Sequence, residues 1–299
     1  MLTDVDVRML LGLATHRVLT TAQAAQVAGL PLRTASYRLT RLRGLGLADR
    51  ARPYARSGSA PLHWWLTTAG RRRVGAPGRT RAAWTSPLFL MHTAATAAVP
   101  LALDAHGPSV GLRLLSWLRD EQAWEHFTAG WGLGDLRITP DGLAVVQVES
   151  AGDAVPLLVE VDRATMPLGR LREKVHRYLR YAGSGAWAAR HGMCPVLLVL
   201  TTCDERAANT LAAAVKERER VPAPTGELVV ASSGRVDNAA EAVTAPVWRS
   251  DRDGTIAAVP HTLTDLLAYR LGTERDGSLR PELPWERSLS ESATPWQVR

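Results

Sequence analysis

The stretch VPLLVEVDRAT, residues 155–165, decides the fold of the larger part of this chain. An apolar run that contains Glu160 and Asp162 predicts a buried strand over residues 155–162. Because strand side chains alternate between the two faces of a sheet, Glu160 and Asp162 point to the same face. A buried carboxylate is costly without a partner, so each acid requires a hydrogen bond, a cation or a metal ion.

The residues before this strand predict a β-hairpin. Residues 143–149 are also strand-like, and SAGDA at 150–154 has turn chemistry. A turn centred on the Gly-Asp pair of this segment places Asp141 opposite Asp162 or Arg163, close to both strand acids. Like charges that meet there disfavour joint ionisation unless a cation neutralises them, and oxygen ligands suit Mg²⁺ or Mn²⁺.

A basic helix is predicted after the strand. The pattern LGRLREKVHRYLRYAG, residues 168–183, places Lys174, Tyr178 and Tyr181 along one side at i, i+4 and i+7. Lys174 is also one of only two lysines among the 36 basic residues of the chain. We therefore expect a lysine and two phenols close to the acidic strand.

The other apolar patterns of this larger module predict a mixed α/β domain built on a sheet. We expect helices over residues 87–105 and 111–127, the second carrying Glu121, and over 204–220. Strands are expected over residues 194–202, 227–233 and 245–251.

The first part of the chain is strongly basic. Residues 1–81 contain 14 Arg, no Lys and three acidic residues, which is a net charge of +11 within a chain whose total is +7. The remaining residues therefore carry −4. Such an asymmetry is typical of a module that binds a polyanion, most often nucleic acid.

The same residues predict a winged helix-turn-helix. Helical patterns cover residues 4–14, 19–30 and 31–47, and strand-like segments at 47–52 and 63–66 flank a Gly/Ser/Pro tip. This motif lays its third helix in the DNA major groove. On that helix we expect the apolar residues Leu32, Ala35, Leu39 and Leu42 to face inward. The residues that we expect to contact phosphates or base edges are Arg33, Thr34, Ser36, Tyr37, Arg38, Arg41 and Arg43 of that helix, with Arg52 and Arg56 of the wing. The alternative is a small helical module that binds a protein.

Composition limits the class of protein. No stretch has the roughly 20 consecutive apolar residues that a membrane span needs, and the N-terminus lacks the layout of a signal peptide, so we expect a cytoplasmic protein. Cys194 and Cys203 have a poor spacing for a metal site and are interpreted as structural thiols. The expected organisation is a DNA-binding domain at 1–75, a linker at 76–86, a larger domain at 87–273 and a loosely ordered tail at 274–299.

Two resemblances follow from these motifs. Pro140-Asp141, then Glu160-Val161-Asp162, then a helix, resembles the PD-(D/E)xK restriction-endonuclease-like core. Over roughly residues 5–250, the stretches LLVEVDRAT, LREKVHRYLRY and CPVLLVLTTCDERAANTL behind a predicted winged helix resemble the replication-relaxation family of actinobacterial plasmids, phages and integrative elements. That family is similar to MobC-type relaxases.

The resemblance implies a role for each candidate residue. Asp141 and Glu160 would hold Mg²⁺ or Mn²⁺, with Asp162 as a third ligand or an acid on a metal-bound water and Glu121 as the helix acid. Asp162 stands where such nucleases usually have lysine, and Lys174 on the next helix is located to replace it. A relaxase also holds the cut strand, which makes Tyr178 or Tyr181 a candidate nucleophile.

The leading hypothesis is thus a DNA-binding, metal-dependent nicking protein of a mobile element. Its expected partner is double-stranded DNA, with other replication or transfer proteins and a second copy of the chain as further candidates, and no membrane. The alternatives are a non-catalytic DNA-binding accessory factor with a degenerate nuclease fold, and a transcriptional regulator whose second domain senses a small ligand.

Overall fold

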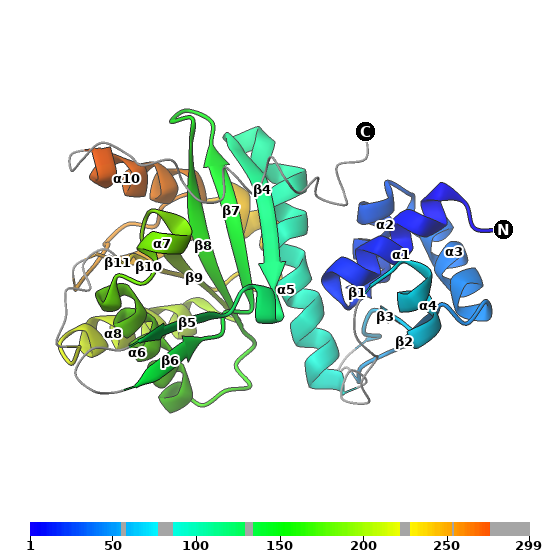
Figure 1. Cartoon of the computed structure of the whole chain (residues 1–299), viewed down its shortest axis with the longest axis horizontal. Coiled ribbons are helices and arrows are strands. Elements are labelled where there is room, and N and C mark those ends of the chain that lie inside the picture. The colour runs from blue at the N-terminus through cyan, green and yellow to red at the C-terminus, as the bar shows by residue number, and fades with distance from the viewer. Residues whose placement is uncertain (55–57, 77–85, 129–133, 222–227, 253, 276–299) are drawn as a thin grey trace. The chain divides into compact units, whose positions relative to one another are not determined.

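The computed structural model describes residues 1–54, 58–76, 86–128, 134–221, 228–252 and 254–275, and it divides into two compact units (Figure 1). The first unit is Met1–Leu101 and the second is Ala102–Arg299. The division falls inside helix α5 (Pro87–His106) and not in the predicted linker, most of which lies outside the described residues. The first part of α5 packs on the core of the first unit through Leu90, Ala94, Ala97 and Leu101.

Helices and a small sheet make up the rest of the first unit. Its helices are α1 (Asp4–His16), α2 (Thr21–Ala28), α3 (Leu32–Gly44) and α4 (Thr68–Arg73). Its antiparallel sheet has the order β1 (Leu19–Thr20), β3 (His63–Leu66), β2 (Ala48–Ala51). Thr3 and Thr20 begin α1 and α2 with capping boxes, in which side chain and backbone satisfy each other's free groups.

The burial of α3 agrees with the predicted helix except at its first residue. Ala35, Leu39 and Leu42 are buried in the core of the first unit, as predicted. Leu32 is exposed, which corrects the prediction that it faces inward. It opens the helix directly after Pro31, before the helix runs onto the core.

The second unit is built on a mixed sheet of seven strands, which confirms the predicted α/β class at this level. The strand order is β12 (Thr255–Ile256), β11 (Arg249–Arg252), β10 (Val230–Ser233), β9 (Val196–Thr201), β8 (Asp153–Asp162), β7 (Gly142–Val148), β4 (Leu112–Arg119). β8 pairs in parallel with β9 and antiparallel with β7. A separate hairpin joins β5 (Glu125–Thr128) to β6 (Asp135–Ile138).

The register of the β7–β8 hairpin differs from the predicted one. Gly142 pairs with Val159 and Val148 with Asp153, so the loop is residues 149–152. The turn is therefore centred on residues 150–151, two residues earlier than predicted, and Gly152 closes it with a positive φ of 71°. Asp141 consequently lies opposite Glu160, which is closer to the strand centre than predicted.

Residues 111–127 are not the predicted helix. They form the 3-10 turn Asp120–Gln122 between β4 and β5. A β-bulge between Leu114 and Ser116 shifts the alternation of β4 by one residue. The shift gives Leu114, Leu115 and Leu118 the i, i+1, i+4 spacing of a helix, which misled the prediction.

Helices α6 (Leu168–Ser184) and α8 (Asp204–Arg218) pack against each other and share one core with the sheet (Figure 1). Leu158 of β8, Leu179 of α6 and Leu211 of α8 all belong to this core. Leu158 has the same parity as Glu160 and Asp162, so these two acids also face α6 and α8. The remaining helices are α7 (Ala188–His191), α9 (Ala239–Thr244) and α10 (Leu263–Arg275), which extends two residues into the predicted tail at 274–299.

Among the described residues, one segment is long and apolar enough to cross a membrane. It runs from Pro87 to Val110 and contains α5, and half of its best window is buried inside the structure. A core helix of a soluble protein has the same character, so the segment is weak evidence for a membrane span.

Candidate functional site

A buried carboxylate lies at the centre of the candidate site. Glu160 of β8 is 5% exposed, and its two oxygens bind the ammonium of Lys174 and the hydroxyl of Tyr178. Both partners lie on α6 at the i, i+4 spacing that the sequence showed. The structure therefore brings together Glu160, Lys174 and Tyr178, three of the residues to which the sequence assigned a candidate role.

Asp141 lies beside Glu160. The Val161 amide donates to Asp141 Oδ2 at 2.8 Å, and the Asp141 amide donates to the Val159 carbonyl at 3.0 Å. These two bonds fix Asp141 against β8, across from Glu160. Asp141, Glu160 and Lys174 thus gather into one group, which we call the acid-lysine cluster.

The cluster has an excess of negative charge. Burial raises the pKa of Glu160 to about 8, the charge of Lys174 opposes this rise, and the charge of Asp141 adds to it. Burial alone would lower the pKa of Lys174, but Glu160 and Asp141 raise it above its ordinary value. Burial and the adjacent Glu160 also raise the pKa of Tyr178. Two carboxylates around one ammonium favour binding of a proton or a further cation.

Asp162 belongs to a different contact. Its carboxylate is bound by the guanidinium of Arg206, with Nη2 at 3.1 Å, and accepts the Ala164 amide at 3.0 Å. Arg206 lies in the first turn of α8 and also donates to the Met166 carbonyl. Sequence reasoning missed Arg206 because nothing near it in the sequence indicates that α8 packs beside β8.

The predicted set of four metal ligands is not gathered at one place. Glu121 is exposed on the 3-10 turn Asp120–Gln122 and not on a helix. Within the ranges that the structure describes, no group of three or more His, Cys, Asp or Glu residues is arranged to hold a metal ion. The two carboxylates of the acid-lysine cluster are the predicted ligands that do meet.

Another buried carboxylate lies outside the predicted set of site residues. Glu125 of β5 accepts from the Tyr181 hydroxyl at 2.5 Å and lies 2.5 Å from Nε2 of His191, and all three residues are buried. Burial raises the pKa of Glu125, but the hydrogen bond and charge of His191 outweigh it and hold the pKa below its ordinary value. These contacts tie β5 and α7 to α6.

Burial argues against a covalent role for either tyrosine. Tyr178 is 1% exposed and Tyr181 is 0% exposed, and each hydroxyl is bound to a glutamate. A nucleophile for a DNA phosphate must reach solvent and lose its proton, and here burial and a carboxylate both raise the phenol pKa. Tyr178 instead donates a hydrogen bond to Glu160.

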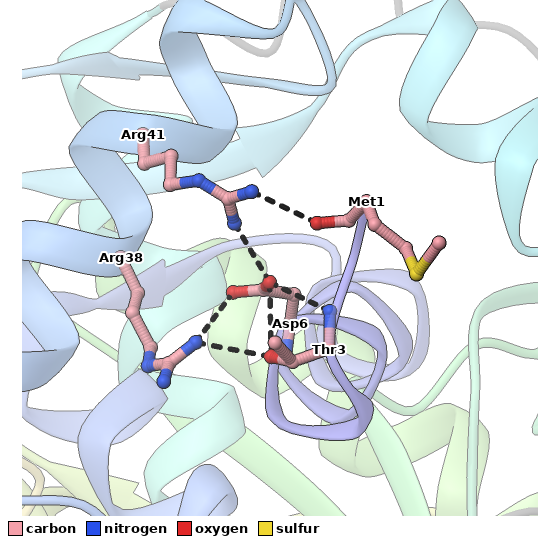
Figure 2. A network of polar contacts seen from close by, with 5 residues as sticks. All are labelled: Met1, Thr3, Asp6, Arg38 and Arg41. Atoms are coloured by element: carbon pink, nitrogen blue, oxygen red, sulfur yellow. Dashed lines mark hydrogen bonds and ion pairs between the residues drawn. The ribbon is translucent and has the colours of Figure 1, made fainter.

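In the first unit, the carboxylate of Asp6 is fully buried. Figure 2 shows Asp6 of α1 held by Arg38 at 3.1 Å and Arg41 at 2.9 Å, both from α3. Thr3 adds hydrogen bonds from its amide at 2.9 Å and its hydroxyl at 3.0 Å. Burial raises the pKa of Asp6, but the bonds from Thr3 and the charge of Arg38 lower it overall.

This network changes the expected roles of two arginines. Arg38 and Arg41 fix α3 to α1 and are partly buried, so their guanidinium groups are already engaged. Arg33 and Tyr37 are exposed, with Tyr37 at 72%. They are the α3 side chains best placed to reach a ligand.

The other predicted contact residues of the first unit are distributed around α3 and β2. Thr34 and Ser36 are partly exposed. Arg43 is exposed and pairs with Asp49 of β2 at 3.1 Å. Arg52 is exposed and donates to Ser59, while Arg56 lies outside the described residues.

Comparison with protein families decides the classification. The family model named Replication-relaxation matches residues 10–197, which is more than half of the chain. The chain belongs to the replication-relaxation family. Membership points to a role in the replication or relaxation of mobile genetic elements. In this replication-relaxation protein the match includes the acid-lysine cluster and α3, and it ends before Arg206.

Searches beyond the family give only partial similarities. The structure of RV1404 from Mycobacterium tuberculosis is 27% identical over 25% of this chain and 50% of its own, with a TM-score of 0.23. The structure of NadR in complex with 4-hydroxyphenylacetate is 25% identical over 25% of this chain and 53% of its own, with a TM-score of 0.22. The chain therefore spans about half the length of each. No curated protein matches it.

Proposed function

We propose that this replication-relaxation protein binds double-stranded DNA through its first unit and nicks it, with a divalent metal, through its second. The observation that carries the proposal is the meeting of Asp141, Glu160 and Lys174 in one buried group. Two acids and a lysine are the side chains that a PD-(D/E)xK nuclease needs, and the lysine here comes from α6.

The first unit supports DNA binding by its element order. Helices α1, α2 and α3 are followed by the β2–β3 hairpin, and β1 completes a three-stranded sheet. We assign this order to a winged helix-turn-helix, whose third helix enters the major groove. Arg33 and Tyr37 on the exposed face of α3 would then read phosphates or base edges.

The second unit supports phosphodiester chemistry through its charges. Lys174 lies beside the two acids, where its ammonium would stabilise negative charge that develops on a phosphate. Asp162 stands at the usual lysine position. Its carboxylate is bound by Arg206, so it does not add a third acid to the acid-lysine cluster. In this proposal Lys174 takes the place of the lysine that the familiar motif has at the position of Asp162.

The donor set fits a loosely held Mg²⁺ or Mn²⁺ and not a closed protein cage. Asp141 and Glu160 would hold the ion, and Mg²⁺ in proteins keeps several waters and is often bound by one or two carboxylates plus substrate phosphates. Such an ion would polarise the phosphate and activate a water. The observation that favours a cation there is that two carboxylates, Asp141 and Glu160, lie around a single ammonium.

The test is a nicking assay on supercoiled plasmid that carries the origin. With Mg²⁺ or Mn²⁺, we expect open circles from the wild type and a loss of at least about 100-fold in rate for Glu160→Gln, the size typical of removing an electrostatic group from an active site. Glu149→Gln makes the same change at the exposed hairpin loop and should nick normally.

Two outcomes would overturn the proposal. One is a wild-type protein that binds origin DNA but makes no nicks with either metal. The other is a Glu160→Gln protein that nicks as fast as Glu149→Gln.

A second candidate is a non-catalytic DNA-binding accessory factor. The observation that favours it is that both oxygens of Glu160 are already bound, by Lys174 and Tyr178. A buried, satisfied ion pair has a structural role in many proteins. Under this alternative Glu160→Gln leaves origin-dependent plasmid transfer unchanged, and the wild type shows no affinity for Mn²⁺ in the presence of DNA.

A further inference from the structure

The outer side of α6 forms a basic groove with α8. The groove has a volume of about 710 Å³ and is lined by four arginines and two glutamates. Arg172, His176 and Arg180 recur along α6 every four residues, and Arg220 comes from the residues after α8. We call this surface the α6–α8 groove, and its helices lie side by side in Figure 1.

One of the two acids in the groove is neutralised internally. Glu217 is buried and is bound by Arg172 at 2.9 Å, Arg220 at 2.8 Å and His176 at 3.2 Å. Burial raises the pKa of Glu217, but Arg172 and Arg220 outweigh it and keep the pKa low. Glu217 therefore holds the two arginines in place at the groove wall.

The remaining basic side chains are available. Arg177 is exposed and Arg180 is partly exposed, and in the described part of the chain neither makes a hydrogen bond or an ion pair. Two positioned arginines and two unpaired ones along an open groove favour an extended anion over a small one. Among the described residues that line the groove there is no Phe, Tyr or Trp on which a base could stack, so the groove suits a sugar-phosphate backbone.

We propose that the α6–α8 groove binds the phosphate backbone of DNA next to the acid-lysine cluster. This inference rests on the proposed function, since it assigns the path of that substrate. Helix α6 connects the two surfaces: Lys174 and Tyr178 face β8, while Arg177 and Arg180 face the groove. A strand bound along α6 passes within about one helical turn of Lys174.

The test uses the full chain and a short fluorescein-labelled duplex of random sequence. Arg177→Glu/Arg180→Glu should weaken binding at least about tenfold at low salt and reduce the slope of log affinity against log salt by about 2, roughly one per lost phosphate contact. Lys216→Glu/Arg249→Glu makes the same change in net charge at exposed positions outside the groove and should leave the slope unchanged. Arg177→Lys/Arg180→Lys should restore most of the slope.

Equal effects of the two charge-reversal variants would overturn the inference, because they would reflect only long-range charge. Loss of binding to phosphatidylserine vesicles in the groove variant, with an unchanged DNA slope, would assign the groove to a membrane surface and also overturn it. Melting curves of the variants and the wild type are the control for unfolding, and equal melting temperatures exclude it as the cause of weaker DNA binding. This measurement does not depend on nicking. If the wild type makes no nicks but Arg177→Glu/Arg180→Glu still reduces the slope of log affinity against log salt, only the nuclease proposal is rejected.

Discussion

Asp6 in the first unit and Glu160 in the second are both buried acids bound by basic residues of a neighbouring helix. Their pKa values nevertheless shift in opposite directions. Asp6 has two arginines and Thr3 around it, and its pKa is lowered. Glu160 has one lysine and a second carboxylate, and its pKa is raised to about 8.

The difference separates a structural ion pair from a candidate site. Where cations outnumber acids, the carboxylate is satisfied and holds two helices together. Where acids outnumber cations, the uncompensated negative charge favours the binding of a proton, a metal ion or both. The predictions below test this distinction.

The largest expected effect is on nicking. Asp141→Asn removes the second carboxylate of the acid-lysine cluster and should lower the nicking rate by at least about 100-fold. Asp162→Asn is the matched change on the same strand, in a pair with Arg206, and should keep nicking within a few-fold of wild type. Similar losses in the two variants, measured under single-turnover conditions, would contradict the division of the acids between cluster and structural pair.

The next effect concerns the stability of the first unit. Asp6→Asn leaves two arginines without a counter-charge and should lower the free energy of unfolding by about 2–3 kcal/mol, somewhat less than for a fully buried pair because the arginines are partly exposed. Asp4→Asn, at an exposed position of the same helix turn, should cost only about 0.5 kcal/mol. Urea denaturation measures both, and equal losses would remove the special role of Asp6.

The pH dependence of that contribution has a defined sign. Because the folded-state pKa of Asp6 is lowered, its stabilisation is fully present above the ordinary carboxyl pKa of 3.8 and is lost as the pH falls through the lowered value. The wild type and Asp6→Asn should therefore converge in stability at strongly acidic pH.

A smaller effect is expected for DNA contacts of α3. Arg33→Ala and Tyr37→Ala should each weaken DNA binding by about tenfold and change the unfolding free energy by less than about 0.5 kcal/mol, since both side chains are exposed. Arg38→Ala should instead lose stability, because it breaks the contact with Asp6. Fluorescence anisotropy and denaturation of the same samples separate the two roles. A stable Arg38→Ala protein with weak DNA binding would return Arg38 to the DNA-contact set.

The last prediction concerns how the free energy of unfolding changes with pH. A carboxyl group whose folded-state pKa is raised loses stability as pH increases from its ordinary pKa to the folded one. The unfolding free energy of the wild type should therefore fall relative to Glu160→Gln between about pH 5 and 8, by at most about 1.4 kcal/mol per pH unit. The difference between wild type and Glu149→Gln should not change with pH. If the difference in unfolding free energy between wild type and Glu160→Gln does not change with pH, Lys174 compensates fully for the burial of the Glu160 charge.

Local patterns allowed much of the candidate site to be predicted. The parity of β8 placed Glu160 and Asp162 on one face, and the i, i+4 spacing placed Lys174 and Tyr178 together on α6. The position of Asp141 was predicted near this group, with a partner two or three residues from the observed one because the turn was centred too late. Hairpin registers depend on the turn conformation, which a glycine allows but does not determine.

Other features depended on contacts between distant segments. Nothing near Asp162 indicated that Arg206, 44 positions away, would pair with it, and nothing near Glu125 indicated His191, 66 positions away. Arg38 was predicted as a DNA contact because its own helix places it outward, and only the packing of α1 against α3 shows its bond to Asp6.

The sequence by itself determined the elements around β8 and the basic character of the first unit. It also determined that two acids, Glu160 and Asp162, lie on one strand and that Lys174 lies on the helix that follows it. Periodicity and charge are properties of neighbouring residues, so they can be read directly from the chain. Only the tertiary structure decided which buried acid received which cation. That choice depends on which segments distant in sequence meet in the core, where an unpaired charge is too costly to remain and each acid is matched with the nearest available partner.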